Sequence, residues 1–182
     1  MNGLQRFFGH LHTVNKHRRT VRKLCFKCGL YWQGITHDLS KYSPTEFWNG
    51  VRFYTGTASP HIGERKAYGY SKAWLNHKGH NKHHAEYWND IRPNGKTEPI
   101  DMPNKYLAEM ICDRVAASMT YLGKTYHDAA PLEYYLSHKD ENQFSEQTRK
   151  DLEGILSLIA EDSLAMTMIN IKKAVRMKEK KL

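Results

Sequence analysis

The sequence has little cysteine, no long apolar run and no acidic residue near its start. Three cysteines among 182 residues are too few for the disulfide framework of a small secreted domain. No apolar stretch approaches the roughly 18 residues of a membrane span, and no apolar core of a secretory signal is present. We therefore expect a cytoplasmic protein with no membrane partner.

The positive charge lies at the two ends of the chain. Residues 1–37 hold seven bases and no acid, and residues 171–182 hold six bases and one acid, whereas the stretch between them holds 15 bases and 18 acids. Basic ends suit the phosphate backbone of a nucleic acid, but no helix-turn-helix, RRM or zinc-finger pattern accompanies them. We interpret them as solvated helix faces and keep a nucleic-acid partner as the alternative.

Apolar residues recur at helical spacing along most of the chain, and strand signals are nearly absent. Two stretches with glycine and proline, residues 54–69 and 91–102, indicate loops. The pattern predicts an all-α helical bundle, a single domain with residues 1–125 as its core and residues 126–182 as helices packed on that core. The expected helices cover residues 3–29, 43–51, 70–90, 103–123, 130–138, 145–160 and 162–179.

Two local patterns carry more specific expectations. The string Ser43-Pro44-Thr45-Glu46 predicts a helix start in which Ser43 caps, Pro44 is the first helical residue and Glu46 closes a capping box. The pair Cys25-x-x-Cys28 resembles half of a zinc site, but Cys112 stands alone and no second pair completes it. We expect buried cysteines on a helix face instead.

Eleven histidines point to metal chemistry, because neutral imidazoles bind divalent transition metals and a carboxylate can join two ions. His37 and Asp38 are adjacent, and Asp113 stands among small apolar residues that favour an inward carboxylate in need of a partner. Histidines also crowd one segment, with several at spacings that share a helix face. That segment contains His77, His80, His83 and His84.

The order of these residues resembles the HD-domain superfamily of metal-dependent phosphohydrolases, all-α proteins with the order H…HD…D. The string from His37 to Lys41 is similar to the H-D-I-G-K of the branch that hydrolyses cyclic dinucleotides, although the G-Y-P signature of that branch is absent. The string from His37 to Phe47 also resembles a small family of bacteria and phages. The resemblance implies an HD-domain-like bundle and favours His17 over His12 as first ligand. The implied ligands are His17, His37, Asp38, His77, His83, His84 and Asp113.

These residues lead to one expected function and two alternatives. We expect a divalent-metal-dependent phosphohydrolase that acts on an anionic small molecule, a nucleotide or another phosphate ester, with one or two ions of Fe, Mn, Co, Ni or Zn. Asp38 and Lys41 are the candidate catalytic residues, with Lys41 as a point charge for the phosphate. The alternatives are an HD-type di-iron oxygenase and a non-enzymatic nucleic-acid-binding protein.

Overall fold

The computed structural model describes residues 1–139 and 143–179, with side chains described up to residue 175. The described residues form nine α-helices, three short 3₁₀ helices and one small hairpin, so the all-α class is confirmed. The α-helices are α1 Gly3–Lys27, α2 Tyr31–Thr36, α3 Pro44–Arg52, α4 Pro60–Tyr68, α5 Lys72–His80, α6 Asn104–Leu122, α7 Ala130–Ser137, α8 Glu146–Glu161 and α9 Leu164–Glu179. The 3₁₀ helices are η1 Leu39–Tyr42, η2 Ala85–Tyr87 and η3 Gly123–Thr125.

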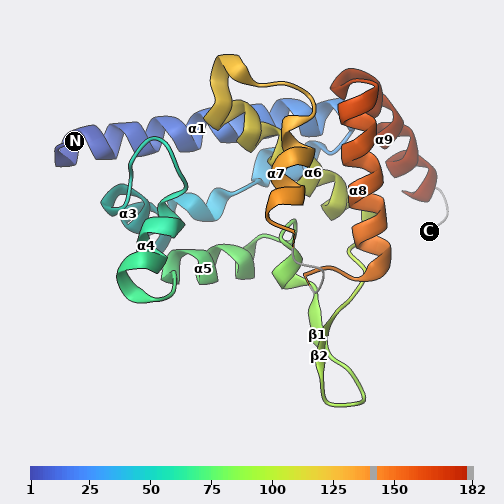
Figure 1. Ribbon diagram of the computed structural model, residues 1–182, viewed down its shortest axis with the longest axis horizontal. Helices are drawn as coiled ribbons and strands as arrows, with labels where there is room; N and C mark the ends of the chain where they lie inside the picture. Colours follow the sequence, from blue (N-terminus) through green and yellow to red (C-terminus); the bar gives the residue numbers. More distant parts are fainter. Residues whose placement is uncertain (140–142, 180–182) are drawn as a thin grey trace.

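The long helix α1 runs along the molecule and organises the other elements around it (Figure 1). It packs against α2, α3, α6 and α9. The helices α3, α4 and α5 lie toward one end of the molecule, and α7, α8 and α9 lie toward the other (Figure 1). Because α6 crosses between these two groups, its residues contribute to both the apolar core and the polar site described below.

The apolar core lies where α1, α6, α8 and α9 meet. Val21, Ile111, Leu156 and Ile159 are fully buried there, at spacings that give each helix one inward apolar face. All three cysteines are free and buried. The Sγ atoms of Cys28 and Cys112 lie 4.0 Å apart within this core, which confirms that the cysteines belong to buried helix faces.

The expected loop over residues 54–69 is wrong, because part of this stretch is a helix. Within residues 54–69 the chain forms α4, which starts at Pro60 after Ser59 and is followed by the capping residue Gly69, with φ 77°. Gly63 is not a breaker here, because its bare backbone packs close to Phe53, where a Cβ would approach to 3.2 Å. The pattern of prolines and glycines indicated a loop, but these residues instead begin the helix, fit its packing surface and end it.

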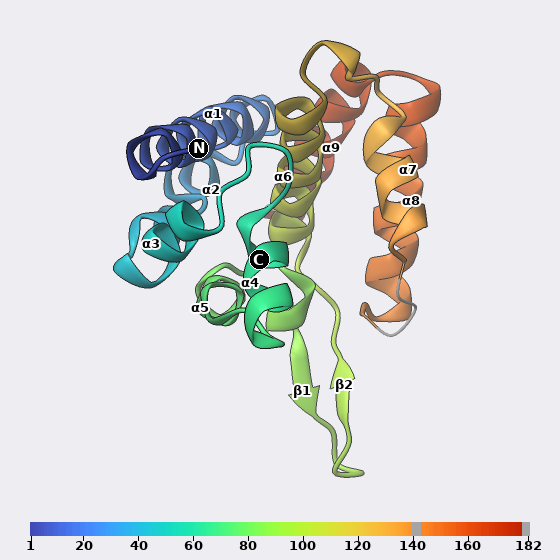
Figure 2. The same ribbon diagram turned by 60° about the vertical axis from the view of Figure 1, so that its left-hand side comes forward.

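The segment around residue 90 also differs from the expectation. The predicted helix over residues 70–90 is shorter, because α5 ends at His80. The strands β1 Asn89–Ile91 and β2 Thr97–Pro99 then pair antiparallel, with Asp90 opposite Glu98. Figure 2 shows this hairpin projecting from the helical body. Its strands are three residues long and mostly exposed, so they lack the apolar alternation that identifies a strand in a sequence.

None of the helices in the described ranges combines the length and apolarity that a bilayer crossing requires.

Candidate metal centre

Five segments of the chain bring the predicted site residues together. His17 comes from the middle of α1, His37 and Asp38 follow α2, and His77 lies near the end of α5. The turn after α5 supplies His83 and His84, and α6 supplies Asp113. All seven residues predicted as ligands therefore lie in one region, although up to 96 positions separate them in the sequence.

The backbone at Asp38 is unusual. Asp38 has φ 52° and ψ 30°, and among residues 1–139 and 143–179 it is the one non-glycine residue with positive φ. Aspartate tolerates this left-handed conformation better than most residues, but strain of this kind persists only where the surroundings enforce it. The conformation joins α2 to η1 and leaves both His37 and Asp38 buried, with 2 % of each residue exposed.

The two carboxylate oxygens of Asp38 face different groups of histidines. Oδ2 lies 3.5 Å from Nε2 of His37 and 4.0 Å from Nε2 of His17. Oδ1 lies 3.4 Å from Nε2 of His77 and 3.4 Å from Nε2 of His83. The carboxylate thus stands between two groups of potential ligands, with one oxygen facing each group.

We call these groups the first and second clusters. The first cluster is His17, His37 and Asp113, whose potential ligand atoms lie within 4.8 Å of one another. In it, Oδ1 of Asp113 is 2.9 Å from Nε2 of His17 and 3.6 Å from Nε2 of His37. The second cluster is Asp38 with His77, His83 and His84, where the Nε2 atoms of His77 and His84 are 2.9 Å apart.

Three buried polar atoms in this region have no hydrogen-bond partner among the described residues. They are Nε2 of His37, Nε2 of His83 and Oδ1 of Asp38. A buried polar atom without a partner costs about 1–3 kcal/mol, so three of them in one place need an explanation. Imidazole nitrogens and a carboxylate oxygen are all metal ligands, and divalent cations bound at the two clusters would satisfy these atoms. The donor set therefore fits a metal ion.

Two buried glutamates hold the outer sides of the histidine rings. Oε1 of Glu109 lies 2.9 Å from Nδ1 of His37 and 3.2 Å from Nδ1 of His83. Oε2 of Glu46 lies 2.8 Å from Nδ1 of His77. Metal-bound histidines characteristically donate their second N–H to a carboxylate in this way, which fixes the tautomer and the orientation of the ring.

The Glu46 side chain does not close the predicted capping box. Ser43 does cap α3, since its Oγ accepts from the Glu46 amide at 3.4 Å. The Glu46 carboxylate instead accepts hydrogen bonds from His77 and from Nδ2 of Asn76, the latter at 2.7 Å. Neither this role of Glu46 nor the presence of Glu109 beside the histidines was predicted from the sequence. The sequence does hold a signal for Glu109. It stands four residues before Asp113, and this spacing puts both carboxylates on one face of a helix.

The charges of the site favour ionised carboxylates and neutral outer imidazoles. Burial raises the pKa of the Asp38 carboxyl, but the neighbouring His37 and His77 outweigh burial and hold it well below its usual value. Burial also raises the pKa of the Glu109 carboxyl, and hydrogen bonds from His37 and His83 bring it below its usual value. Burial and the adjacent His83 lower the pKa of His84, so this ring is in the neutral form that binds metals.

His37 differs from His77 and His84, because its pKa is raised whereas theirs are lowered. Burial lowers this pKa, but the carboxylates of Asp38, Asp113 and Glu109 around the ring outweigh burial. Without a cation, the His37 ring is therefore protonated and surrounded by three carboxylates. Metal binding must displace that proton, since only the unprotonated nitrogen is a ligand.

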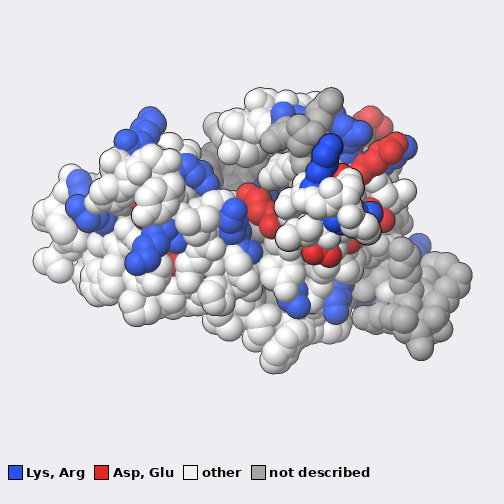
Figure 3. Space-filling model, turned by 90° about the horizontal axis from the view of Figure 1, so that it is seen from below, with Lys and Arg blue, Asp and Glu red and all other residues white. Residues whose placement is uncertain are grey.

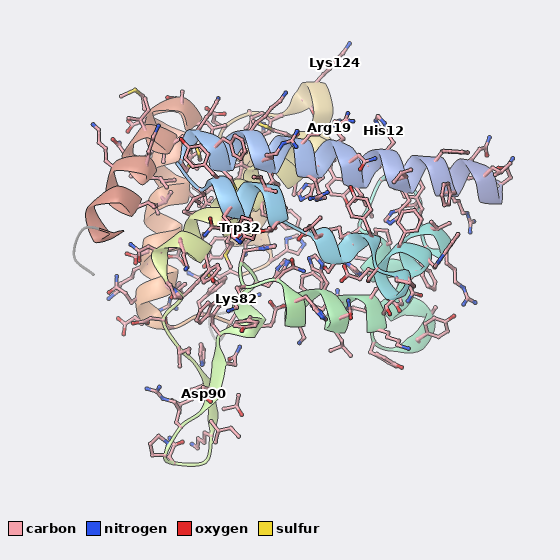
Figure 4. All side chains as sticks on the ribbon, turned by 180° about the vertical axis from the view of Figure 1, so that it is seen from behind. His12, Arg19, Trp32, Lys82, Asp90 and Lys124 are labelled. Atoms are coloured by element: carbon pink, nitrogen blue, oxygen red, sulfur yellow. The ribbon has the colours of Figure 1, made fainter. Side chains whose placement is uncertain are left out.

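The remaining histidines fall outside the two clusters. His12 and His80 are exposed, and Figure 4 shows His12 on the outer side of α1. The structure therefore brings His17, and not His12, to the other ligands. His10 is buried against α3, where Gly50 leaves room for its ring. The ring of His61 lies beside the second cluster, with its centroid 6.1 Å from that of His77.

The protein surface beside the site is basic where α4 and α5 form it. Arg65, Lys66 and Lys72 are exposed there, whereas Glu46 and Glu64 are buried. Viewed from below in Figure 3, basic side chains predominate over this end of the molecule, and acidic side chains gather toward the opposite end. Acids turned inward and bases turned outward give this end a positive field.

The fold and the site together define a helical protein with a buried histidine and carboxylate centre suited to metal ions. The chain belongs to a family of unknown function, DUF5662, whose model matches residues 6–158. This range includes every residue of the two clusters. No curated protein and no solved structure matches the chain.

Proposed function

We propose that this protein is a divalent-metal-dependent phosphohydrolase that acts on a nucleotide or another small phosphate ester. The observation that carries the proposal is the shared Asp38 carboxylate, whose two oxygens face separate clusters with unpartnered buried nitrogens. A carboxylate shared by two ligand groups is the arrangement expected of a two-metal hydrolytic site, in which paired ions bind both the attacking and the leaving oxygen.

Each cluster offers a complete ligand set for one ion. His17, His37 and Asp113 with one Asp38 oxygen would hold the first, and His77, His83 and His84 with the other oxygen would hold the second. When bound, such ions lower the pKa of a water molecule and neutralise phosphate oxygens as charge develops. A mixture of imidazole and carboxylate ligands suits Fe, Mn, Co, Ni or Zn.

The site has a buried floor and an accessible edge. The side chains of His37, Asp38, His77 and His83 are at most 2 % exposed, whereas those of His17 and Asp113 are 13 % and 19 % exposed. An anionic substrate would therefore approach from the side of α1 and α6. A small phosphate group, and not a folded macromolecule, matches an edge of this kind.

Lys41 provides the positive charge at that edge. Its Nζ lies 3.5 Å from Oδ2 of Asp38, and its side chain is 22 % exposed. Burial lowers the pKa of Lys41, but the carboxylates of Asp38 and Glu46 outweigh burial and raise it, so the ammonium group stays charged at neutral pH. We assign Lys41 to binding and orienting a phosphate oxygen of the substrate.

A direct test uses protein freed of metal and reloaded with Mn, Fe, Co or Ni. At least one reloaded form should hydrolyse p-nitrophenyl phosphate or a nucleoside phosphate. Lys41→Met should lower kcat/KM on the order of 100-fold, as expected for a lost transition-state charge contact, while its metal content is maintained. Lys66→Met, at an exposed position of α4, is the matched control. Unchanged kcat/KM in Lys41→Met would remove Lys41 from the mechanism, and no hydrolysis by any loaded form would contradict the proposal.

One observation supports a second candidate, an oxygen-activating di-iron enzyme. The second cluster offers three imidazoles and one carboxylate oxygen, and such nitrogen-rich ligand sets suit iron. Protein loaded with iron would then show an iron-dependent visible absorption and would consume oxygen with an organic substrate. A colourless, hydrolytically active manganese form would favour the phosphohydrolase.

A further inference from the structure

We propose that Glu109 couples the two clusters, so that a divalent cation bound at one cluster raises the affinity of the other. The proposal rests on the metal centre of the proposed function and concerns how that centre is filled. It follows from one carboxylate oxygen that holds a histidine of each cluster.

The contacts of Glu109 are shared in a way that those of Glu46 are not. The same oxygen, Oε1, is 2.9 Å from Nδ1 of His37 and 3.2 Å from Nδ1 of His83. His37 belongs to the first cluster and His83 to the second. The two rings lie side by side, with centroids 4.4 Å apart. Glu46 contacts a histidine of the second cluster only.

These contacts determine which nitrogen of each ring is free. A carboxylate accepts hydrogen bonds, so Nδ1 of both rings is the donor and Nε2 is the nitrogen left to bind a cation. In His37, the cation must first displace the proton that this ring holds in the metal-free protein. The Nε2 atoms of His37 and His83 are the ones without partners. Glu109, His37 and His83 also lie within ligand distance of one another, but with Nδ1 occupied by hydrogen bonds, Glu109 positions the ligands and is not itself one.

Coupling follows from the shared oxygen. A cation on Nε2 of His37 withdraws electrons from the ring and makes its Nδ1–H a stronger donor, which fixes Glu109 in place. A fixed Glu109 in turn orients His83 before the second cation arrives. The coupling must be reciprocal, because linkage requires each ion to change the affinity of the other by the same factor. Repulsion between two cations at one carboxylate acts in the opposite direction, so positive coupling is a demanding prediction.

The test measures metal occupancy alone. Metal-free protein receives one equivalent of Zn²⁺ per chain, and native mass spectrometry counts chains with no, one and two ions. Two independent tight sites, whatever their affinities, leave at least about half of the chains with one ion, and only positive coupling lowers that fraction. We expect the one-ion fraction of the wild type to fall clearly below one half.

Two isosteric variants separate coupling from ordinary ligand support. Glu109→Gln should restore a one-ion fraction of one half or more and weaken the first ion bound by about 10- to 100-fold, because both clusters lose an outer partner. Glu46→Gln leaves the first cluster intact, so this variant should bind the first of its two ions as tightly as the wild type does.

A wild-type one-ion fraction at or above one half would overturn the proposal, and this result does not depend on how any variant folds. Equal losses of first-ion affinity in the two variants would also overturn it. Non-cooperative binding in an active hydrolase would remove this inference alone. Cooperative binding without hydrolysis of any phosphate ester would remove the proposed activity and leave the coupling intact.

Discussion

Replacing Asp38 with asparagine should abolish most of the stability that the proposed metal ions would give to the fold. Each ion present at 100 times its Kd adds about 2.7 kcal/mol to the free energy of unfolding. Two ions therefore add about 5 kcal/mol and raise Tm by roughly 10–20 °C for a chain of this size. Asp38→Asn replaces one of the two carboxylate oxygens with an amide nitrogen and removes the negative charge that both clusters face. If each Kd rises 100-fold, each ion adds only about 0.4 kcal/mol, and Tm rises by roughly 2–3 °C.

The assay compares thermal unfolding of chelated and metal-loaded protein at one metal concentration. The quantity of interest is the rise in Tm on loading, because it cancels the effect of the substitution on the metal-free fold. Asp90→Asn is the control, since Asp90 is exposed on the hairpin, away from the clusters (Figure 4). An equal rise in Asp38→Asn and the wild type would refute the assignment of Asp38 to both clusters.

Two further predictions concern the support of α3 by α1. Gly50→Ala should lower the free energy of unfolding by about 1–3 kcal/mol, because a Cβ there would overlap the ring of His10. The control Gly154→Ala, in open space on α8, should raise the free energy of unfolding by about 0.5–1 kcal/mol. Urea unfolding in which both substitutions change this free energy in the same direction would contradict the packing of His10 against Gly50. Burial and the charge of Lys41 lower the pKa of His10 to about 4, so the unfolded chain binds the proton first and stability declines by about 3 kcal/mol as pH falls from 6.5 to 4. His10→Gln should remove that part of the decline in metal-free protein, and an unchanged slope of stability against pH would contradict the buried neutral ring.

The helices that could be predicted from the sequence are those with an uninterrupted apolar period. Residues 103–123 correspond to α6, which the structure places between Asn104 and Leu122, and the last two helices also lie close to their predicted ranges. Helix α4 could not be predicted, because Pro60, Gly63 and the following Gly69 also match a loop. The information that decides between them is tertiary, namely the close contact of Gly63 with Phe53.

The candidate ligands could be proposed from the sequence because their order and spacing are distinctive. What could not be proposed is their division into two clusters around one carboxylate. That division depends on the left-handed backbone of Asp38 and on contacts between distant segments. Glu109 meets His37 across 72 positions of the chain and Glu46 meets His77 across 31. No local sequence pattern encodes contacts between such distant residues, so the roles of both glutamates are visible only in the folded structure.

The most direct test of the central claim is anomalous X-ray scattering from crystals of the manganese- or zinc-loaded protein. We expect two anomalous peaks per chain, one on each side of the Asp38 carboxylate, with His17, His37 and Asp113 at one and His77, His83 and His84 at the other. A fully loaded crystal with no peak beside Asp38, or with a single ion bound by residues of only one cluster, would contradict it.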